Sequence, residues 1–392
     1  MLALTFLYPP TIEFEWLVQR PQQLMTAFAQ LGNKVVYMNP TANEQKAKRT
    51  QRPLPNLYVL NGQDPHQYLQ QKPVYYFSCT AHIEHAAQYD PSLVVFDFLD
   101  EAVEEFEMWS KYKTKALKKS DLVITTSKKL LQQSLLSNPN TVMVPNGCDY
   151  AFFSQAQKQI FEVPPDMWNI RHPIIGYHGA VASWLDFSLI RKIARNFPDY
   201  SLVMVGPLYN VSEVPQEPNI HWLGLKPYHV LPAYAQQFDV GIVPFRISPM
   251  TEAVNPIKMW EYLAAGLPVV STALPEVKDF PEVCFSRNDK EFLDNIKDCL
   301  INDSPEKRQA RINLAHDNSW TTRAQKILES IHKILNEKAI KKSSRKISAG
   351  SQRAKSAASF ASERLIVQNN LQTSKGIFLH IDTMRSDKNK IR

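Results

Sequence analysis

The hydrophobic residues of this chain gather in short runs, and each run is followed by a segment with helical spacing. This alternation is typical of β/α units that form a parallel sheet. The strands predicted in the first half are Ala3–Tyr8, Lys34–Asn39, Val74–Ser78, Leu93–Asp97, Leu122–Ser127 and Thr141–Asn146. The helices predicted between them are Arg20–Leu31, Ala102–Lys118 and Lys128–Ser137. We therefore expect one doubly wound domain over residues 1–160.

The same alternation begins again after a proline-marked break at Ser154–Pro173. The strands predicted there are Ile174–Tyr177, Ser201–Gly206, Ile220–Leu223, Val240–Phe245 and Pro268–Ser271. The predicted helices are Asp186–Phe197, His229–Gln237, Pro256–Ala265 and Trp320–Leu335. We expect a second doubly wound α/β domain over residues 170–335. Two such domains in tandem place a cleft between the carboxyl ends of two sheets, where ligands of open α/β sheets bind.

The formal net charge of +7 comes from the C-terminal end of the chain. Residues 336–392 hold thirteen Lys or Arg and four Asp or Glu, whereas residues 1–335 have a net charge of −2. A body without a basic excess predicts no nucleic-acid binding. The tail lacks a sustained period, which predicts a disordered segment. We expect it to bind an anionic membrane; the alternative is a solvated tail with no target.

Several function classes are excluded by missing motifs. The chain has no G-x-G-x-x-G, G-x-x-x-x-G-K-[ST], G-x-S-x-G, H-E-x-x-H or Asp-x-Asp sequence. These absences argue against nicotinamide oxidoreductases, P-loop NTPases and ordinary serine hydrolases. We also expect no metal site and no cofactor. Four cysteines without a Cys-x-x-Cys pair favour a reduced compartment, and neither a secretory signal nor a membrane-spanning run is predicted. These features predict a cytoplasmic protein, or one peripheral on the inner face of a membrane.

The most informative segment precedes the strand Pro268–Ser271. A loop ends at Asn255, Pro256 begins a helix, and Lys258 and Glu261 stand three residues apart on one helix face. The free amides of a helix N-terminus bind phosphate, and Lys258 adds a full charge. Glu261 is placed to accept hydrogen bonds from ribose hydroxyls. The alternative is that the two residues form a surface ion pair.

The helix segment and several others resemble one enzyme family in sequence and in order. They are Trp16 with Arg20–Leu24, Asp97–Glu101, Ser120–Ser127, Val144–Asp149 with Phe152, Ile175–Ala180 with Trp184–Asp186, Asn219–Lys226 and Asn255–Val270. Over roughly residues 1–335 the chain resembles retaining GT-B glycosyltransferases of family 4. The resemblance implies two Rossmann-like domains facing a central cleft and no obligatory metal. It also implies a nucleotide-sugar donor held by the C-terminal domain and an acceptor facing the N-terminal one.

The resemblance implies roles for individual residues. Glu261 would bind the donor ribose, and the amides near Gly179 and around Asn255 and Pro256 would meet the diphosphate. The chain also departs from the family pattern. Ala253 replaces a second glutamate, and Ala180 stands where an arginine is frequent, with no lysine shortly after it. Charge neutralisation of the leaving diphosphate must therefore come from other residues.

Two cations are the candidates for that catalytic role. Lys258 is the first and Arg20, at the start of the first predicted helix, is the second. Either would stabilise the charge that develops on the departing nucleotide. For Arg20 the alternative is a solvated residue at the helix start or a salt bridge to Glu15.

Acceptor chemistry is expected on the N-terminal domain. Asp97 and Asp100 end a buried run whose carboxyl end faces the predicted cleft, and Asp100 is our candidate to hold a sugar or acceptor hydroxyl. The alternative is that Asp100 caps the helix Ala102–Lys118. Trp16 is a candidate acceptor platform, or else a packed core residue.

Taken together, the sequence predicts transfer of a sugar, with retention, from a nucleoside-diphosphate sugar to an acceptor hydroxyl. The acceptor is expected to be lipid-linked or a growing bacterial surface glycan. Two alternatives stay open at this point: a catalytically silent GT-B scaffold that binds a nucleotide sugar or a partner, and a GT-B nucleotide-sugar epimerase. The sequence names neither the base, the sugar, the acceptor, the linkage nor the oligomeric state.

Overall fold

The N-terminal half folds as the predicted parallel sheet. The computed structural model describes residues 3–40, 50–158 and 160–344. Within these residues the first sheet has eight strands in the order β3-β4-β2-β1-β5-β6-β7-β8, and only β3 runs antiparallel to its neighbour. The strands are β1 Thr5–Tyr8, β2 Lys34–Met38, β3 Thr50–Leu54, β4 Leu57–Leu60, β5 Val74–Phe77, β6 Leu93–Phe98, β7 Leu122–Thr125 and β8 Thr141–Met143.

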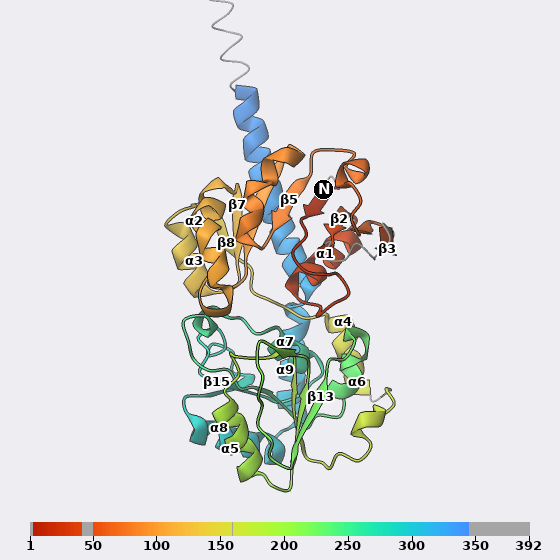
Figure 1. The fold of residues 1–392 in the computed structure, drawn as a ribbon, viewed down its shortest axis with the longest axis vertical. Helices are drawn as coiled ribbons and strands as arrows, with labels where there is room; N and C mark the ends of the chain where they lie inside the picture. The colour runs from red at the N-terminus through yellow and green to blue at the C-terminus, as the bar shows by residue number, and fades with distance from the viewer. Residues whose placement is uncertain (1–2, 41–49, 159, 345–392) are drawn as a thin grey trace, which may run out of the picture. The chain divides into compact units, whose positions relative to one another are not determined.

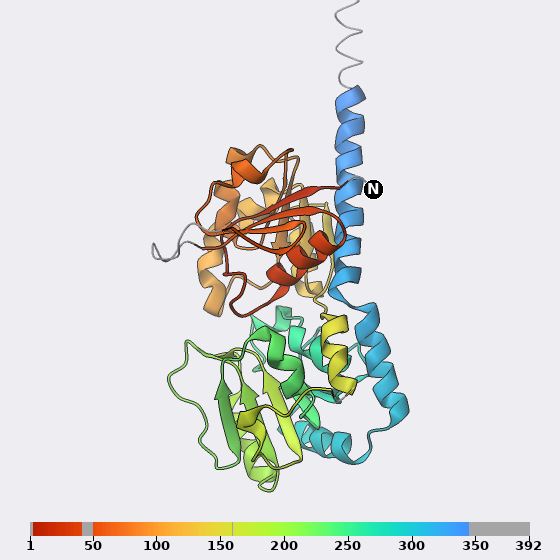
Figure 2. The ribbon, with the colours of Figure 1, turned by 90° about the vertical axis from the view of Figure 1, so that its right-hand side faces the viewer.

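Helices cover both faces of this sheet (Figures 1 and 2). They are α1 Arg20–Gln30, α2 Ser110–Lys119 and α3 Lys128–Leu135. The predicted helix Ala102–Lys118 is wrong in its first half, because α2 begins only at Ser110. A 3₁₀ segment, η4 Glu104–Trp109, precedes it, with Glu104 at φ 52° and Phe106 outside helical geometry. The short 3₁₀ segments η1 Pro65–Tyr68, η2 Thr80–Glu84 and η3 Ala86–Tyr89 complete this half.

The second sheet is parallel throughout its six described strands, in the order β13-β11-β9-β14-β15-β16. These strands are β9 Ile174–His178, β11 Ser201–Val205, β13 Ile220–Gly224, β14 Val240–Val243, β15 Val269–Thr272 and β16 Val283–Ser286. A separate two-stranded parallel sheet pairs β10 Val181–Ala182, which follows β9, with β12 Leu208–Tyr209, which follows β11. The sheet order reverses between β9 and β14, which is where open α/β sheets bind ligands.

The helices of this half include two that the sequence pattern did not reveal, α8 and α9. The helices are α4 Tyr150–Phe153, α5 Phe187–Asn196, α6 Leu231–Ala235, α7 Ile257–Ala264, α8 Asp289–Ile301 and α9 Pro305–Asp317. The predicted helix His229–Gln237 is shorter than expected, because the 3₁₀ turn η7 Tyr228–Val230 precedes α6. The remaining 3₁₀ segments are η5 Ser154–Lys158, η6 Pro165–Met167 and η8 Thr251–Ala253.

Residues up to His332 form one unit that holds both sheets, and a second unit begins at Lys333. Residues 320–344 are helical, so the predicted last helix continues beyond Leu335. The part of the predicted tail from 336 to 344 is therefore helical rather than disordered. The rest of the tail, 345–392, lies outside the described residues. No helix in the described part of the chain is both long and apolar enough to cross a membrane.

Candidate functional site

A cavity of about 540 Å³ lies at the carboxyl ends of both sheets. The N-terminal half contributes the loop after β1 and residues at the end of β6, and the C-terminal half contributes the ends of β9, β11 and β14 together with α7. The predicted site residues in its wall are Trp16, Arg20, Asp100, Gly179, Asn255, Pro256, Lys258 and Glu261. All eight residues, chosen from distant parts of the sequence, thus line one cavity.

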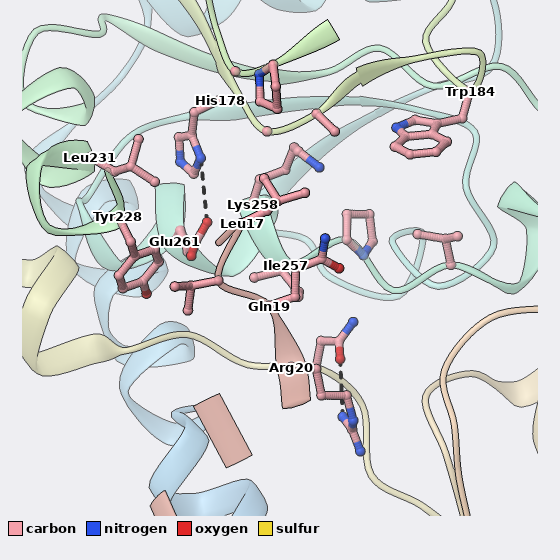
Figure 3. A pocket seen from close by; sticks show the side chains of 18 of the residues that line it. Leu17, Gln19, Arg20, His178, Trp184, Tyr228, Leu231, Ile257, Lys258 and Glu261 are labelled. Carbon is pink, nitrogen blue, oxygen red and sulfur yellow. Dashed lines mark hydrogen bonds and ion pairs between the residues drawn. The ribbon is translucent and has the colours of Figure 1, made fainter. Parts of the chain in front are cut away.

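The helix α7 presents its N-terminal turn to this cavity. Pro256 precedes the first helical residue, Ile257, and its own φ of −70° suits a helix start. The helix ends where Gly266 takes a φ of +79° and the Leu267 N–H donates to the Tyr262 carbonyl. Its opposite face is packed in the core, with Trp260 and Tyr262 fully buried. The core therefore fixes the rotation of α7, and with it the directions of Lys258 and Glu261 (Figure 3).

Lys258 is a half-buried cation held between two aromatic rings. Its Nζ lies 4.7 Å from the ring centroid of Phe245 and 5.3 Å from that of Tyr177. Burial lowers its pKa to about 8, although the nearby Glu261 opposes the shift. At neutral pH the ammonium group is still protonated. Lys258 therefore brings a positive charge to an environment where electrostatic interactions are strong.

Glu261 is buried, with 5% of its surface exposed, and burial raises its pKa to about 8. Its Oε2 lies 3.6 Å from Nδ1 of His178 (Figure 3). The Tyr228 hydroxyl partly opposes this rise in the pKa of Glu261, and the hydroxyl accepts a hydrogen bond from Gln23 Nε2 at 2.6 Å. The alternative of a surface Lys258–Glu261 ion pair is wrong, because Glu261 lies in the interior.

Two glycines allow the chain to pass close to Lys258. Gly179 follows β9 with a φ of +133°, and a Cβ atom there would lie 2.8 Å from Lys258 Cε. Gly206 follows β11 with a φ of +151°, and a Cβ atom there would lie 1.9 Å from the Gly179 carbonyl oxygen. Any side chain at either position would displace the loop that closes this end of the cavity.

Of the cations that line the cavity, two are already paired. Arg20 is 1% exposed and donates to both carboxylate oxygens of Asp97, at 2.8 and 2.9 Å. Lys226 forms an ion pair with Asp166 at 2.6 Å. Within the described residues, no carboxylate forms an ion pair with Lys258. The alternatives for Arg20, solvent exposure or a bridge to Glu15, are both wrong, and its predicted catalytic role stays a prediction.

Asn255 connects the start of α7 to the N-terminal domain. Its Oδ1 accepts hydrogen bonds from the Asn146 amide N–H at 3.1 Å and from Trp260 Nε1 at 2.9 Å. The Asn146 side chain donates to the Asn255 carbonyl at 2.6 Å and accepts from Arg20 Nη1 at 3.1 Å. The side-chain oxygen and the backbone carbonyl of Asn255 are thus both occupied by protein contacts.

The two candidate acceptor residues stand on the N-terminal side of the cavity. Trp16 is 41% exposed, so it is not a packed core residue. Asp100 is half-buried, and burial raises its pKa to about 6. The alternative that Asp100 caps the helix Ala102–Lys118 is wrong, because Val103 precedes the 3₁₀ turn there and α2 begins later.

The two departures from the family pattern have different surroundings. Ala253 is fully buried in an apolar cluster with Leu130 of α3, so it makes no polar contact with the cavity. Ala180 lines the cavity without a polar side chain, and its carbonyl accepts a hydrogen bond from the Tyr177 hydroxyl at 2.8 Å. Among the described residues no group of three or more metal-ligating side chains is found.

Comparison with known proteins finds a sequence match in the C-terminal half of the chain. Residues 173–302 match the family model described as Glycosyl transferases group 1. A relative from Bacillus subtilis (strain 168), TuaH, is named as a teichuronic acid biosynthesis glycosyltransferase. It is 36% identical over 140 residues, which cover 34% of this chain and 34% of TuaH. The match thus spans about a third of that relative's length.

Solved structures match over a larger share of the chain. Sucrose-phosphate synthase from Thermosynechococcus elongatus has a TM-score of 0.67 at 14% identity, over 86% of this chain and 100% of that protein. HepE from Anabaena, in complex with UDP and glucose, has a TM-score of 0.62 at 12% identity, over 84% and 99% of the two chains. These likenesses confirm the predicted α/β architecture as a GT-B fold.

Proposed function

We propose that this chain, which carries a group 1 glycosyltransferase domain in a GT-B fold, is a glycosyltransferase that uses a nucleoside-diphosphate sugar. The observation that carries the proposal is the position of Lys258. It is the cation of the cavity without a carboxylate partner in the described structure, and it stands one helical turn from Glu261. One helix thereby brings a charge for the diphosphate and a carboxyl group for the ribose.

In this proposal the chemistry is electrostatic. The backbone at Gly179 and the first turn of α7 bind the diphosphate, and Lys258 opposes the negative charge that grows as the glycosidic bond breaks. Enclosure by Phe245 and Tyr177 strengthens that interaction, because the rings exclude water. Arg20 supports the site by holding Asn146 in place rather than by contact with the donor. No metal or cofactor has a part in this mechanism.

The acceptor is proposed to be a lipid-linked or growing bacterial surface glycan, whose hydroxyl attacks the anomeric carbon of the donor sugar with retention of configuration. The relative TuaH, named for teichuronic acid biosynthesis, supports a surface polysaccharide, and the solved complexes of HepE with UDP support a nucleotide-sugar donor. Retention rests on the sequence resemblance. Asp100 is proposed to hold the acceptor hydroxyl, with the exposed face of Trp16 as a platform for the acceptor sugar.

The basic tail is proposed to hold the enzyme at an anionic membrane. Lysine and arginine near such a surface contribute about 1 kcal/mol each. Sedimentation with anionic and neutral vesicles, for the full chain and for a chain ending at residue 344, tests this. Only the full chain should sediment, and only with anionic vesicles; equal sedimentation of both chains would remove the tail from the proposal.

Incubation with a panel of nucleoside-diphosphate sugars, with and without glycan acceptors, tests the proposed activity. We expect release of the nucleoside diphosphate, accelerated by an acceptor, and an α or β product linkage that matches the donor anomer in proton NMR. Isomerisation of the donor sugar would instead identify an epimerase. Binding without release would identify a catalytically silent scaffold.

A further inference from the structure

Two cysteines of the C-terminal domain lie side by side on neighbouring elements. Cys284 belongs to β16 and Cys299 to the last turns of α8, and their Sγ atoms are 3.4 Å apart as free thiols. They are separated by fifteen positions in sequence. The contact therefore results from the packing of α8 against the sheet, and no local sequence motif predicts it.

The thiol pair opens onto a second cavity, of about 370 Å³, that shares no lining residue with the first. Both cysteines line it, together with the cations Lys307 and Arg311. Cys284 is half-buried and Cys299 is 7% exposed. A small molecule in this cavity therefore meets Cys284 first. The carboxylates of Glu282, Asp298 and Asp303 also line the cavity, and Asp303 pairs with Arg311 at 2.7 Å.

The two thiols are chemically unequal. The pKa of Cys284 is lowered to about 7, because the Cys299 thiol donates a hydrogen bond to it and the two cations add to the effect. The same hydrogen bond and burial raise the pKa of Cys299 above its usual range. Cys284 is thus the more readily ionised of the two thiols, and the thiolate is the reactive form.

We propose that Cys284 and Cys299 form a redox-active dithiol that reacts with small-molecule disulfides through the second cavity. The Cys284 thiolate attacks one sulfur of the disulfide RSSR, a mixed disulfide forms, and RS⁻ leaves. Cys299 gives its proton to the departing thiolate and then attacks Cys284 Sγ, which releases the second RS⁻. The latter takes a proton from water. The thiolate–thiol pair of the protein loses one proton and two electrons, water supplies the second proton, and RSSR becomes two RSH.

Cys79 is an internal control for the reactivity of Cys284. This thiol is also half-buried, but burial raises its pKa, and it has no thiol neighbour among the described residues. Cys148 is fully buried and donates to the Ala315 carbonyl at 3.7 Å. Neither thiol is expected to react at the rate of Cys284.

Exposure of the folded full chain to oxidised glutathione, followed by alkylation in denaturant and peptide mass spectrometry, tests the proposal. We expect two of the four thiols to disappear, a cross-linked peptide joining Cys284 to Cys299, and recovery of both thiols with dithiothreitol. Four alkylated thiols, a glutathione adduct that persists at Cys284 in the wild type, or a link between two chains would overturn it.

Two variants separate the roles of the thiols. Cys299→Ser should accumulate one glutathione adduct per chain at Cys284, because the second step has lost its nucleophile. Cys284→Ser should form no adduct, and Cys79→Ser should behave as wild type. Melting curves identify a variant that fails to fold, and the cross-link in the wild type then decides alone. Glutathionylation of Cys79 at the rate of Cys284 would contradict the assignment.

Discussion

Glu261 Oε2 and His178 Nδ1 lie 3.6 Å apart inside the protein, and the histidine does not neutralise the carboxylate. Burial lowers the pKa of His178 to about 3, and the charge of Lys258 adds to the effect. The imidazole is therefore uncharged at neutral pH. Burial also raises the pKa of Glu261, which favours a neutral carboxyl group beside the neutral ring. The charge of Lys258 partly opposes this rise in the pKa of Glu261.

A raised pKa for Glu261 has a consequence for stability. Between its usual pKa of 4.5 and the folded value of about 8, the folded chain binds more protons at this position than the unfolded chain. Stability contributed by the neutral carboxyl group is complete below about pH 4.5 and is lost as the pH rises toward 8, by up to about 1.4 kcal/mol per pH unit. The lowered pKa of Lys258 affects the pH dependence of stability in a separate range, above about pH 8.

Glu261→Gln removes this titration and keeps the shape of the side chain. The wild type should therefore lose stability relative to the variant from about pH 5 to pH 8. Denaturant unfolding of both proteins across this range measures the difference. Parallel stability curves would show that Glu261 titrates normally.

Lys258→Met should lower turnover more than donor affinity. Methionine keeps an apolar chain between Tyr177 and Phe245 but removes the charge, which is needed most when the diphosphate departs. We expect kcat to fall about 10- to 150-fold, the equivalent of one charge-assisted contact. Steady-state kinetics with donor titration measures kcat and KM separately.

Lys192→Met is the matched control, because Lys192 is exposed and pairs with Asp289 on the surface. Its kinetics should equal those of the wild type. A purely higher KM for Lys258→Met, with kcat unchanged, would place Lys258 in ground-state binding only.

The buried pair of Arg20 and Asp97 predicts a large effect on stability. Asp97→Asn leaves the guanidinium charge uncompensated in the interior and should cost about 3–5 kcal/mol. Asp90→Asn, in the exposed pair with Lys72, should cost less than about 1 kcal/mol. Denaturant unfolding compares the two. Equal small effects would mean that Arg20 is free to serve as a catalytic cation.

The raised pKa of Asp100 leads us to expect that the rate of sugar transfer depends on pH. Its raised pKa of about 6 means that the carboxylate form becomes dominant as the pH rises through 6. If the carboxylate accepts the acceptor hydroxyl proton, kcat/KM for the acceptor should rise through this pH. Asp100→Asn should be slower and lack the rise. An unchanged pH profile in the variant would exclude Asp100 from the reaction.

The fold was predictable where the hydrophobic pattern was regular. The buried runs Leu93–Asp97 and Leu122–Ser127 became β6 and β7 because apolar strands need burial on both faces. The strand β3 was missed because its sequence, TQRPL, has no apolar alternation and contains a proline, as edge strands tolerate. The predicted helix Ala102–Lys118 was wrong at its start, where Glu104 and Glu105 accept hydrogen bonds from Ser248 and Ser183, which are distant in sequence.

The site was predictable where the residues share one helix, and unpredictable where they come from different strands. The spacing of Lys258 and Glu261 was sufficient to place both on one face. The partnership of Arg20 with Asp97 depends on which strands are neighbours, and a single sequence does not reveal this. His178 and Tyr228 were missed as neighbours of Glu261. The one available signal was the position of His178 at the carboxyl end of a strand, directly before Gly179.

The central claim is that Glu261 binds the donor nucleotide, and calorimetric titration of UDP into the wild type, Glu261→Gln and Glu252→Gln tests it most directly. Glu252 is exposed and paired with Lys129, so its variant should bind as the wild type does. Because the Glu261 carboxyl group is mostly neutral at neutral pH, loss of one ordinary hydrogen bond should raise the Kd of Glu261→Gln about 2- to 13-fold, with no loss of thermal stability. A wild type that binds UDP, together with a Glu261→Gln variant of identical Kd, would contradict the account.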